Sequence, residues 1–224
     1  MNPTNNTIFQ AGDVFYTEKE GQFSIFKLIK HDIEFKTYHV KIYNPVDILP
    51  QKEHLGSLKV MTYHAPIDEN GFENPQLISP SDLEEDDLLG YLEYIKQTGN
   101  INEVIQYASK YYQEAYQLSS QKKHELAIVK YSKAIELVPN FFEAIDNRAF
   151  CKMDLGRCEE AIEDFKLSLT VNSDSFLAIF SIGECYFKLG EYPKAKEYFE
   201  QAAVIEPNHQ LPKQFLVKTI EKMS

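Results

Sequence analysis

The sequence predicts an α+β fold, in which a small antiparallel β domain is followed by an α-helical solenoid of three helix pairs and a C-terminal capping helix. Short runs in the N-terminal part alternate apolar and polar residues, as half-buried strands do. The C-terminal part repeats with a period of 34 residues, which is typical of stacked helical hairpins. The expected tail, β domain, connecting helices, three repeats and capping helix are residues 1–10, 11–80, 81–107, 108–141, 142–175, 176–209 and 210–224.

Strand signals begin after a polar segment. Residues 1–10 are rich in Asn and Thr and are expected to form a flexible tail. Apolar or alternating runs begin at Val14, Phe23, Tyr38 and Leu58. The sequence Asp68-Glu69-Asn70-Gly71 is a turn signal. We expect four to five antiparallel strands in a curled or barrel-like sheet, in an order that the sequence leaves open.

Helical signals follow the predicted sheet. Ser81-x-x-Glu84 has the pattern of a capping box, and the acids up to Asp87 suit the first turn of a helix. The helix is expected to continue through Leu92 and to end at Gly99-Asn100. We interpret the acidic run as this helix start rather than as a binding tail.

Residues 176–209 show the repeat unit most clearly. Gly183, Ala195 and Ala202 are small at the positions where two antiparallel helices cross. Large aromatic residues such as Phe199 fill the space between the helices. One such hairpin cannot bury its apolar face alone, so the pattern requires neighbouring hairpins.

The neighbours appear when the register moves back by 34 residues. The matching positions hold Ala149, Leu155-Gly156, Ala161 and Phe165 in the second repeat, and Tyr111, Ala115, Ala127, Tyr131, Ala134 and Pro139 in the first. Residues 108–224 therefore resemble the tetratricopeptide-repeat family. The departures include Lys152 in place of an aromatic residue and Ser173 in place of proline.

The resemblance implies a concave groove that is lined by the first helix of each repeat. Carried over by position, the groove residues are Tyr112, Tyr116, Glu143, Asp146, Asn147, Phe150, Leu177, Phe180, Glu184 and Phe187. Such a groove is aromatic and apolar with an acidic fringe, so we expect a peptide or helix that is apolar and neutral to basic. The alternative that the helix at residues 82–97 or the β domain fills the groove stays open.

Some tetratricopeptide cochaperones hold the C-terminal carboxylate of a heat-shock chaperone in a clamp of two Lys, two Asn and one Arg. Of these positions only Asn147 matches here. The other four hold Tyr112, Tyr116, Leu177 and Ser181. The resemblance therefore does not extend to an acidic ligand. Asn147 either hydrogen-bonds a peptide backbone or makes a structural contact to a neighbouring helix.

No catalytic motif accompanies the repeats. The sequence lacks a glycine-rich phosphate loop, G-x-S-x-G, H-E-x-x-H and C-x-x-C, so we predict a non-enzymatic protein without cofactor. His39 and His64 close two similar tripeptides and can meet on one face of a sheet, but no further ligand accompanies them and no metal site is predicted. Cys151 and Cys185 occupy one repeat position and are expected in the core.

Charge and cysteine content limit the partners and the compartment. The formal net charge is −11, with 8 Lys and Arg against 16 Asp and Glu in the first hundred residues, and no basic stripe supports binding to nucleic acid or an anionic membrane. Three cysteines without framework spacing, together with a polar N-terminus and no long apolar run, favour a cytoplasmic protein.

These observations predict a protein–protein interaction module or scaffold that binds a peptide or helix in the groove. An alternative from another class makes the β domain the active part, either as a small-ligand binder or as a toxin-neutralising protein of the immunity type. In that case the repeats only provide a scaffold. A deep pocket joining His39 or His64 to two acids would indicate an enzyme, and an open apolar groove at Tyr112 and Phe180 would indicate a binding module.

Overall fold

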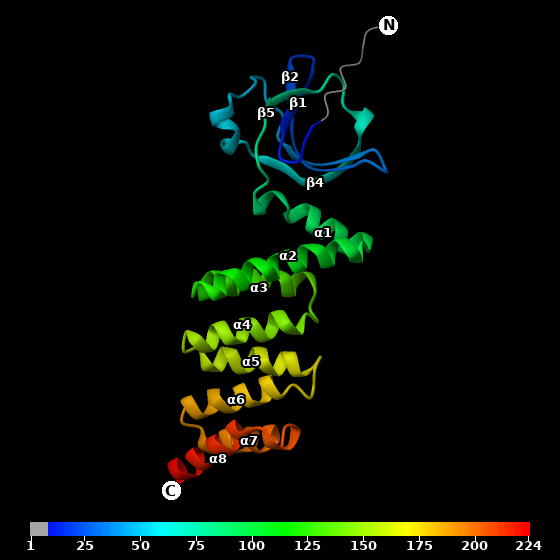
Figure 1. The fold of residues 1–224 in the computed structure, drawn as a ribbon. Helices are drawn as coiled ribbons and strands as arrows, with labels where there is room; N and C mark the ends of the chain where they lie inside the picture. The colour runs from blue at the N-terminus through cyan, green and yellow to red at the C-terminus, as the bar shows by residue number, and fades with distance from the viewer. Residues whose placement is uncertain (1–8) are drawn as a thin grey trace. The chain divides into compact units, whose positions relative to one another are not determined.

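The computed structural model describes residues 9–224, so the first eight residues of the expected tail lie outside the described residues. The chain folds into two compact units, the first ending at Ile101 and the second beginning at Asn102. The first unit holds a β-sheet and one α-helix, and the second is built of helices (Figure 1). The predicted order of a β domain and a helical array is confirmed.

The sheet has five antiparallel strands in the order β4-β3-β2-β1-β5. Its first four strands form a meander, and the last returns to pair with β1. The strands are β1 (Val14–Lys19), β2 (Gln22–Asp32), β3 (Thr37–Tyr43), β4 (Val60–Asp68) and β5 (Gln76–Ser79). Their number agrees with the prediction. Because β4 and β5 are its two edges, the backbone pairing forms an open sheet and not a closed barrel.

One face of the sheet buries a cluster of aromatic rings. Phe15, Phe26, Tyr38 and Phe72 belong to this cluster. Phe9 joins them, with 3% of its surface exposed and its ring 4.3 Å from that of Phe15. Phe9, which the sequence placed in the expected tail, therefore belongs to the core of the first unit, because burial of a phenylalanine ring outweighs the polar character of its neighbours.

Short 3-10 segments connect the strands and lead into the first α-helix. They are η1 (Lys52–Ser57), η2 (Glu69–Gly71) and η3 (Glu85–Asp87), and the helix α1 is Leu89–Thr98. Gly99 ends α1 with φ 73°, as the sequence predicted. Gly90 lets α1 approach β4, since a Cβ at this position would lie 2.7 Å from the carbonyl carbon of Tyr63.

The capping box lies one turn later than the sequence predicted. Glu84 and Asp87 form it, and it starts η3. The Ser81 hydroxyl instead donates to the carbonyl oxygen of Gly12, at 2.7 Å, and so ties the segment after β5 back to the start of β1. Ser81 therefore does not cap a helix, because its hydroxyl already has this partner.

The helical unit contains three antiparallel pairs and a final helix, as predicted (Figure 1). They are α2 (Ile101–Ser120) with α3 (His124–Leu137), α4 (Phe142–Asp154) with α5 (Cys158–Leu169), α6 (Phe176–Lys188) with α7 (Tyr192–Ile205), and α8 (Gln210–Met223). The first repeat helix begins at Ile101 and includes residues 101–107 of the expected connecting helices.

Small residues stand where the helices cross. A Cβ on Gly183 would lie 2.7 Å from the ring of Phe199, and Ala195 and Ala202 are fully buried beside it. The equivalent alanines of the other repeats, among them Ala149 and Ala127, are also fully buried. The structural reason given for the repeat pattern is thus confirmed.

Helix α8 closes the end of the array. The ring of Phe215 lies 5.1 Å from that of Phe199 and 5.4 Å from that of Phe180, and Thr219 is fully buried. The helix covers the apolar face that the last repeat would otherwise expose.

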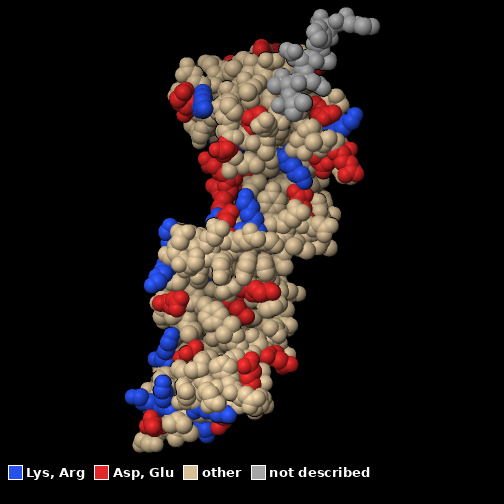
Figure 2. All heavy atoms as spheres, in the orientation of Figure 1, with Lys and Arg blue, Asp and Glu red and all other residues tan. Residues whose placement is uncertain are grey.

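Charged side chains are distributed without a continuous basic band among the described residues on the face that Figure 2 shows. This distribution fits the formal net charge of −11. Within residues 9–224, no helix has both the length and the apolar content needed to cross a bilayer.

Candidate functional site

The predicted groove residues lie on α2, α4 and α6, the first helices of the three repeats, and they differ widely in exposure. Tyr116 is 59% exposed, Leu177 is 51% exposed, and Glu143 is also exposed. The half-buried members are Tyr112, Asn147, Phe150, Glu184 and Phe187. Asp146 and Phe180 are buried.

Phe180 is not part of an open groove wall, which corrects the prediction. Its side chain is 6% exposed, and its ring contacts those of Phe176, Phe199 and Phe215. Phe187 also contacts Phe215, with 5.9 Å between ring centroids. The position of Phe180 in the third repeat is covered because α8 packs against it. The repeat spacing alone does not reveal this contact.

The groove residues of α2 and α4 meet through Asn147. Its amide Nδ2 donates to the hydroxyl of Tyr112 at 3.1 Å and to the carbonyl oxygen of Glu143 at 2.9 Å. The Tyr112 ring stacks on Phe141. Of the two roles that the sequence left open for Asn147, the structure shows the contact to a neighbouring helix. Both hydrogen bonds use the amide nitrogen of Asn147, and neither involves its Oδ1.

Asp146 is the least expected member of the set. Only 9% of its surface is exposed, and its Oδ1 has no hydrogen-bond partner among the described residues. Burial raises the pKa of its carboxyl above the usual value, and the charge of Glu143 raises this pKa further. Burial raises the pKa of Glu184 as well.

The basic residues Arg148 and Lys152 of α4 do not neutralise these carboxyl groups, because both pair with Asp164 of α5. Arg148 makes two bonds to Asp164, at 2.8 and 2.7 Å, and Lys152 lies 2.8 Å from the same carboxylate. Asp164 is buried. Lys152 stands where the family pattern has an aromatic residue, and this ion pair is the physical reason for the departure.

The histidines of the β domain come together as their spacing suggested. His39 Nδ1 and His64 Nε2 are 2.9 Å apart, and Tyr91 and Tyr94 of α1 pack against both rings. Desolvation, with a further contribution from His39, lowers the pKa of His64 to about 4. Within residues 9–224, no three His, Cys, Asp or Glu side chains gather as a metal-ligand set. The two rings therefore pack against each other and against α1.

A buried ion cluster beside them was missed by sequence reasoning. Asp87 lies 2.6 Å from Lys27 Nζ and 2.8 Å from Lys41 Nζ, and all three residues are buried. The signal was present, since alternation on β2 and β3 places both lysines between apolar residues on the strands. We interpreted the acids near Asp87 only as a helix start.

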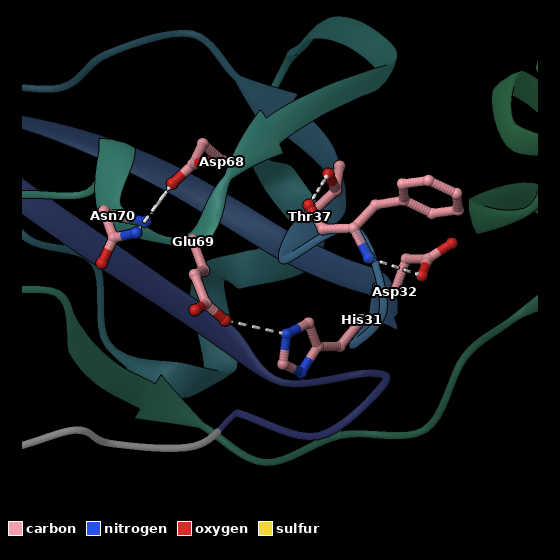
Figure 3. Close-up of polar contacts among 7 residues, drawn as sticks. His31, Asp32, Thr37, Asp68, Glu69 and Asn70 are labelled. Atoms are coloured by element: carbon pink, nitrogen blue, oxygen red, sulfur yellow. Dashed lines mark hydrogen bonds and ion pairs between the residues drawn. The ribbon is translucent and has the colours of Figure 1, made fainter.

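Polar contacts also order the turn between β2 and β3 (Figure 3). Asp32 accepts a hydrogen bond from the backbone N–H of Phe35 at 3.3 Å, and the hydroxyl of Thr37 donates to the carbonyl oxygen of Phe35 at 3.0 Å. His31 reaches across to Glu69 of η2 at 3.2 Å. These contacts fix the loop, and they bring together no nucleophile and base.

The stacked antiparallel pairs, with alanine and glycine at the crossings and an inner face formed by the first helices, define a helical-hairpin repeat protein. Residues 177–209 match the family model for the tetratricopeptide repeat. Residues 108–224 have the repeat architecture that the resemblance implied.

Similar proteins are tetratricopeptide proteins over part of their length. The small glutamine-rich tetratricopeptide repeat-containing protein 2 of Mycosarcoma maydis is 30% identical over 111 residues, which cover 50% of this chain and 32% of that protein. DnaJ homolog subfamily C member 7 of Mus musculus is 32% identical over 123 residues, covering 55% and 22%. The chain thus spans about a third or less of the length of these curated relatives.

Two solved structures share the fold of the array. The Arabidopsis OM64 TPR domain has a TM-score of 0.51 at 19% identity and covers 53% of this chain and 98% of its own. The first TPR of Spaghetti (RPAP3), bound to the HSP90 peptide SRMEEVD, has a TM-score of 0.51 at 24% identity and covers 53% and 94%.

Proposed function

We propose that the helical unit is a non-enzymatic protein-interaction module that binds a polypeptide segment of another protein along α2, α4 and α6. The observation that carries the proposal is the exposure of Tyr116 and Leu177, two large side chains at groove positions of different repeats. Exposed apolar groups rimmed by polar ones are typical of partner surfaces, and aromatic anchors dominate binding energies there. The half-buried Tyr112 and Phe150 extend the same lining.

The ligand differs in charge from the peptide that RPAP3 holds. That peptide, SRMEEVD, ends in acidic residues. In this chain Glu143, Asp146 and Glu184 occupy groove positions. The four clamp positions that do not match the family hold Tyr112, Tyr116, Leu177 and Ser181, and none of these is basic. Like charges across an interface are unfavourable. The proposed ligand is therefore apolar and neutral to basic.

The cysteines support a cytoplasmic location for this activity. Cys151, Cys158 and Cys185 are buried and not bridged, which fits a reducing compartment. Burial raises the pKa of Cys185 to about 12, so its thiol stays protonated at neutral pH.

A peptide selection tests the proposed function. Random peptides displayed on phage are selected against the whole chain, and the affinity of the enriched peptides is measured by fluorescence polarisation. Leu177→Asp places a charge on the groove face and is expected to weaken binding about tenfold or more, which is the loss of about 1.4 kcal/mol that an anchor residue supplies.

The chain offers a matched control for that variant. Leu167 on α5 is 42% exposed, comparable to Leu177, but it lies on a second helix, outside the groove positions. Leu167→Asp should leave affinity within about twofold of wild type, since surface changes away from anchors have small effects. Equal losses in both variants, or no enriched peptide at all, would refute the proposed groove.

A further inference from the structure

The turn between β2 and β3 presents two large apolar side chains to solvent. Ile33 is 78% exposed and Phe35 is 71% exposed. Both belong to the loop of residues 33–36, which follows the last paired residues of the hairpin, Asp32 and Thr37. Single exposed apolar residues are ordinary on protein surfaces, whereas neighbouring ones are typical of places where another molecule binds.

The composition of this loop does not follow from the needs of the turn. Turns favour Gly, Pro, Asn, Asp and Ser, because these residues tolerate the required backbone angles or bond to the backbone. Residues 33–36 are Ile, Glu, Phe and Lys. Lys36 has φ 49°, a left-handed conformation that Gly adopts at lower cost. A polar loop with glycine would suit the turn better, so turn formation does not explain the apolar pair.

The surrounding contacts hold the loop in one conformation. The backbone N–H of Phe35 donates to the Asp32 carboxylate at 3.3 Å, and the backbone N–H of Glu69 donates to the carbonyl oxygen of Lys36 at 2.8 Å. His31 also reaches Glu69, so the loop is tied to η2 as well as to its own strands (Figure 3). A side chain that is already positioned loses less conformational entropy when it binds.

Acidic side chains lie around the apolar pair. Asp32 and Glu34 belong to the hairpin, and Asp68 and Glu69 stand beside it where β4 passes into η2. Lys36 is the only cation between the last residue of β2 and the first residue of β3. Because like charges repel, this rim disfavours an anionic bilayer, and it disfavours a second copy of this chain, whose formal net charge is −11. It favours basic side chains.

We propose that Ile33 and Phe35 form an anchor that inserts into an apolar hollow of a partner protein, and that lysine or arginine side chains of that protein surround the hollow. The aromatic ring supplies a large, rigid contact area, and the carboxylates orient the partner and speed its association. This anchor belongs to the first unit, whereas the groove belongs to the second. The inference therefore goes beyond the proposed function.

Site-specific cross-linking in the native host identifies the partner. Phe35 of the whole chain is replaced by the photoreactive p-benzoylphenylalanine, which keeps an aromatic side chain, and the adducts are identified by mass spectrometry. The same replacement at Ile48 is the control, because Ile48 is 83% exposed and follows the opposite end of β3. We expect a protein adduct at position 35 that is absent at position 48, joined to a segment that contains Lys or Arg.

Binding of the purified partner then tests both parts of the proposal. Phe35→Ser and Ile33→Ser should each weaken affinity about tenfold or more, as loss of an anchor does, and Ile48→Ser should stay within about twofold of wild type. Glu34→Lys should weaken binding in a salt-dependent way, while Glu53→Lys, at an exposed acid of η1, should not. An unchanged affinity in Phe35→Ser, or a tighter complex with Glu34→Lys, would overturn the proposal.

Thermal unfolding separates an anchor from a structural role. Neither Ile33 nor Phe35 buries its side chain, so the two serine variants should melt within about 2 °C of wild type. A larger fall would mean that these side chains stabilise the hairpin itself, and the inference would be wrong.

The remaining outcomes distinguish the anchor from the groove. Adducts with lipid or with a second copy, or no adduct beyond that of the Ile48 control, would overturn the anchor and leave the groove standing. Leu177→Asp should not change the affinity of the cross-linked partner. A partner that Leu177→Asp releases and Phe35→Ser retains would belong to the groove and would also overturn the anchor. Failure of the peptide selection would overturn the proposed function and leave the anchor standing.

Discussion

The ion cluster of the β domain offers a sharp test of the fold. Asp87→Asn keeps the shape of the side chain and an oxygen that can accept the N–H of Glu84, now 3.0 Å from Asp87. It removes the charge that pairs with both Lys27 and Lys41. Burial by itself raises the pKa of Asp87, but the hydrogen bonds from the two lysines outweigh it and hold the pKa below its usual value.

The expected loss of unfolding free energy is large because two buried ammonium groups remain without their carboxylate partner. Side chains of Lys27 and Lys41 are each 10% exposed, so neither is well hydrated where it stands. Removing one partner of a buried ion pair costs about 3–5 kcal/mol. A domain of this size is stable by about 5–15 kcal/mol, so we expect roughly a fifth or more of the stability of the first unit to be lost.

The assay must separate the two units. Hydrogen exchange read by mass spectrometry in increasing urea follows peptides of β2 and β3 apart from peptides of α4 to α7. The Asp87→Asn variant should lose protection in the strands at lower urea and leave the helices unchanged. Asp86→Asn, an exposed neighbour, is the matched control and should shift neither. A loss below about 1 kcal/mol in Asp87→Asn would refute the view that the lysines depend on this carboxylate.

Two further predictions concern the histidine pair and the last helix. Since the folded pKa of His64 is about 4 and an unfolded histidine titrates near 6.5, the unfolded state binds more protons between these values, and the first unit should lose about 2 kcal/mol, after allowance for solvent screening, as pH falls from 6.5 to 4. The same exchange assay at pH 7 and 4.5 measures this, and a His64→Gln variant with an equally steep pH dependence would contradict it. Phe215→Ala should cost about 3 kcal/mol through the lost contacts to Phe180 and Phe199 and should raise exchange in α8. The exposed Val217→Ala is its control and should cost less than about 0.5 kcal/mol, and equal effects of the two would argue against capping by α8.

The helical array was predictable because its chemistry is local and repeated. Gly183, Ala195 and the residues at the equivalent positions of the other hairpins are small because two helices cross there. The period of 34 residues is visible without any knowledge of distant contacts. The strands were visible one by one, but their order was not. The pairing of β5 with β1 joins Val14 to Ser79, and no local pattern encodes such a partner.

The errors share one cause, which is competition from a partner distant in sequence. Phe180 has the right spacing for the groove, but Phe215 of α8 covers it. Ser81 has the right spacing for a helix cap, but its hydroxyl donates a hydrogen bond to the carbonyl oxygen of Gly12 instead. Pattern rules describe what a residue can do locally, and packing decides which of these roles it takes.

The same comparison explains why departures from a repeat are informative in this chain. Lys152 departs from the family pattern, and its ion pair with Asp164 gives a complete structural reason. Asp146 also departs from its neighbours, but the helical unit supplies no partner for its Oδ1. Burial raises the pKa of the Asp146 carboxyl, so the interior of the repeat favours the neutral form of this side chain and thereby limits the cost of the departure.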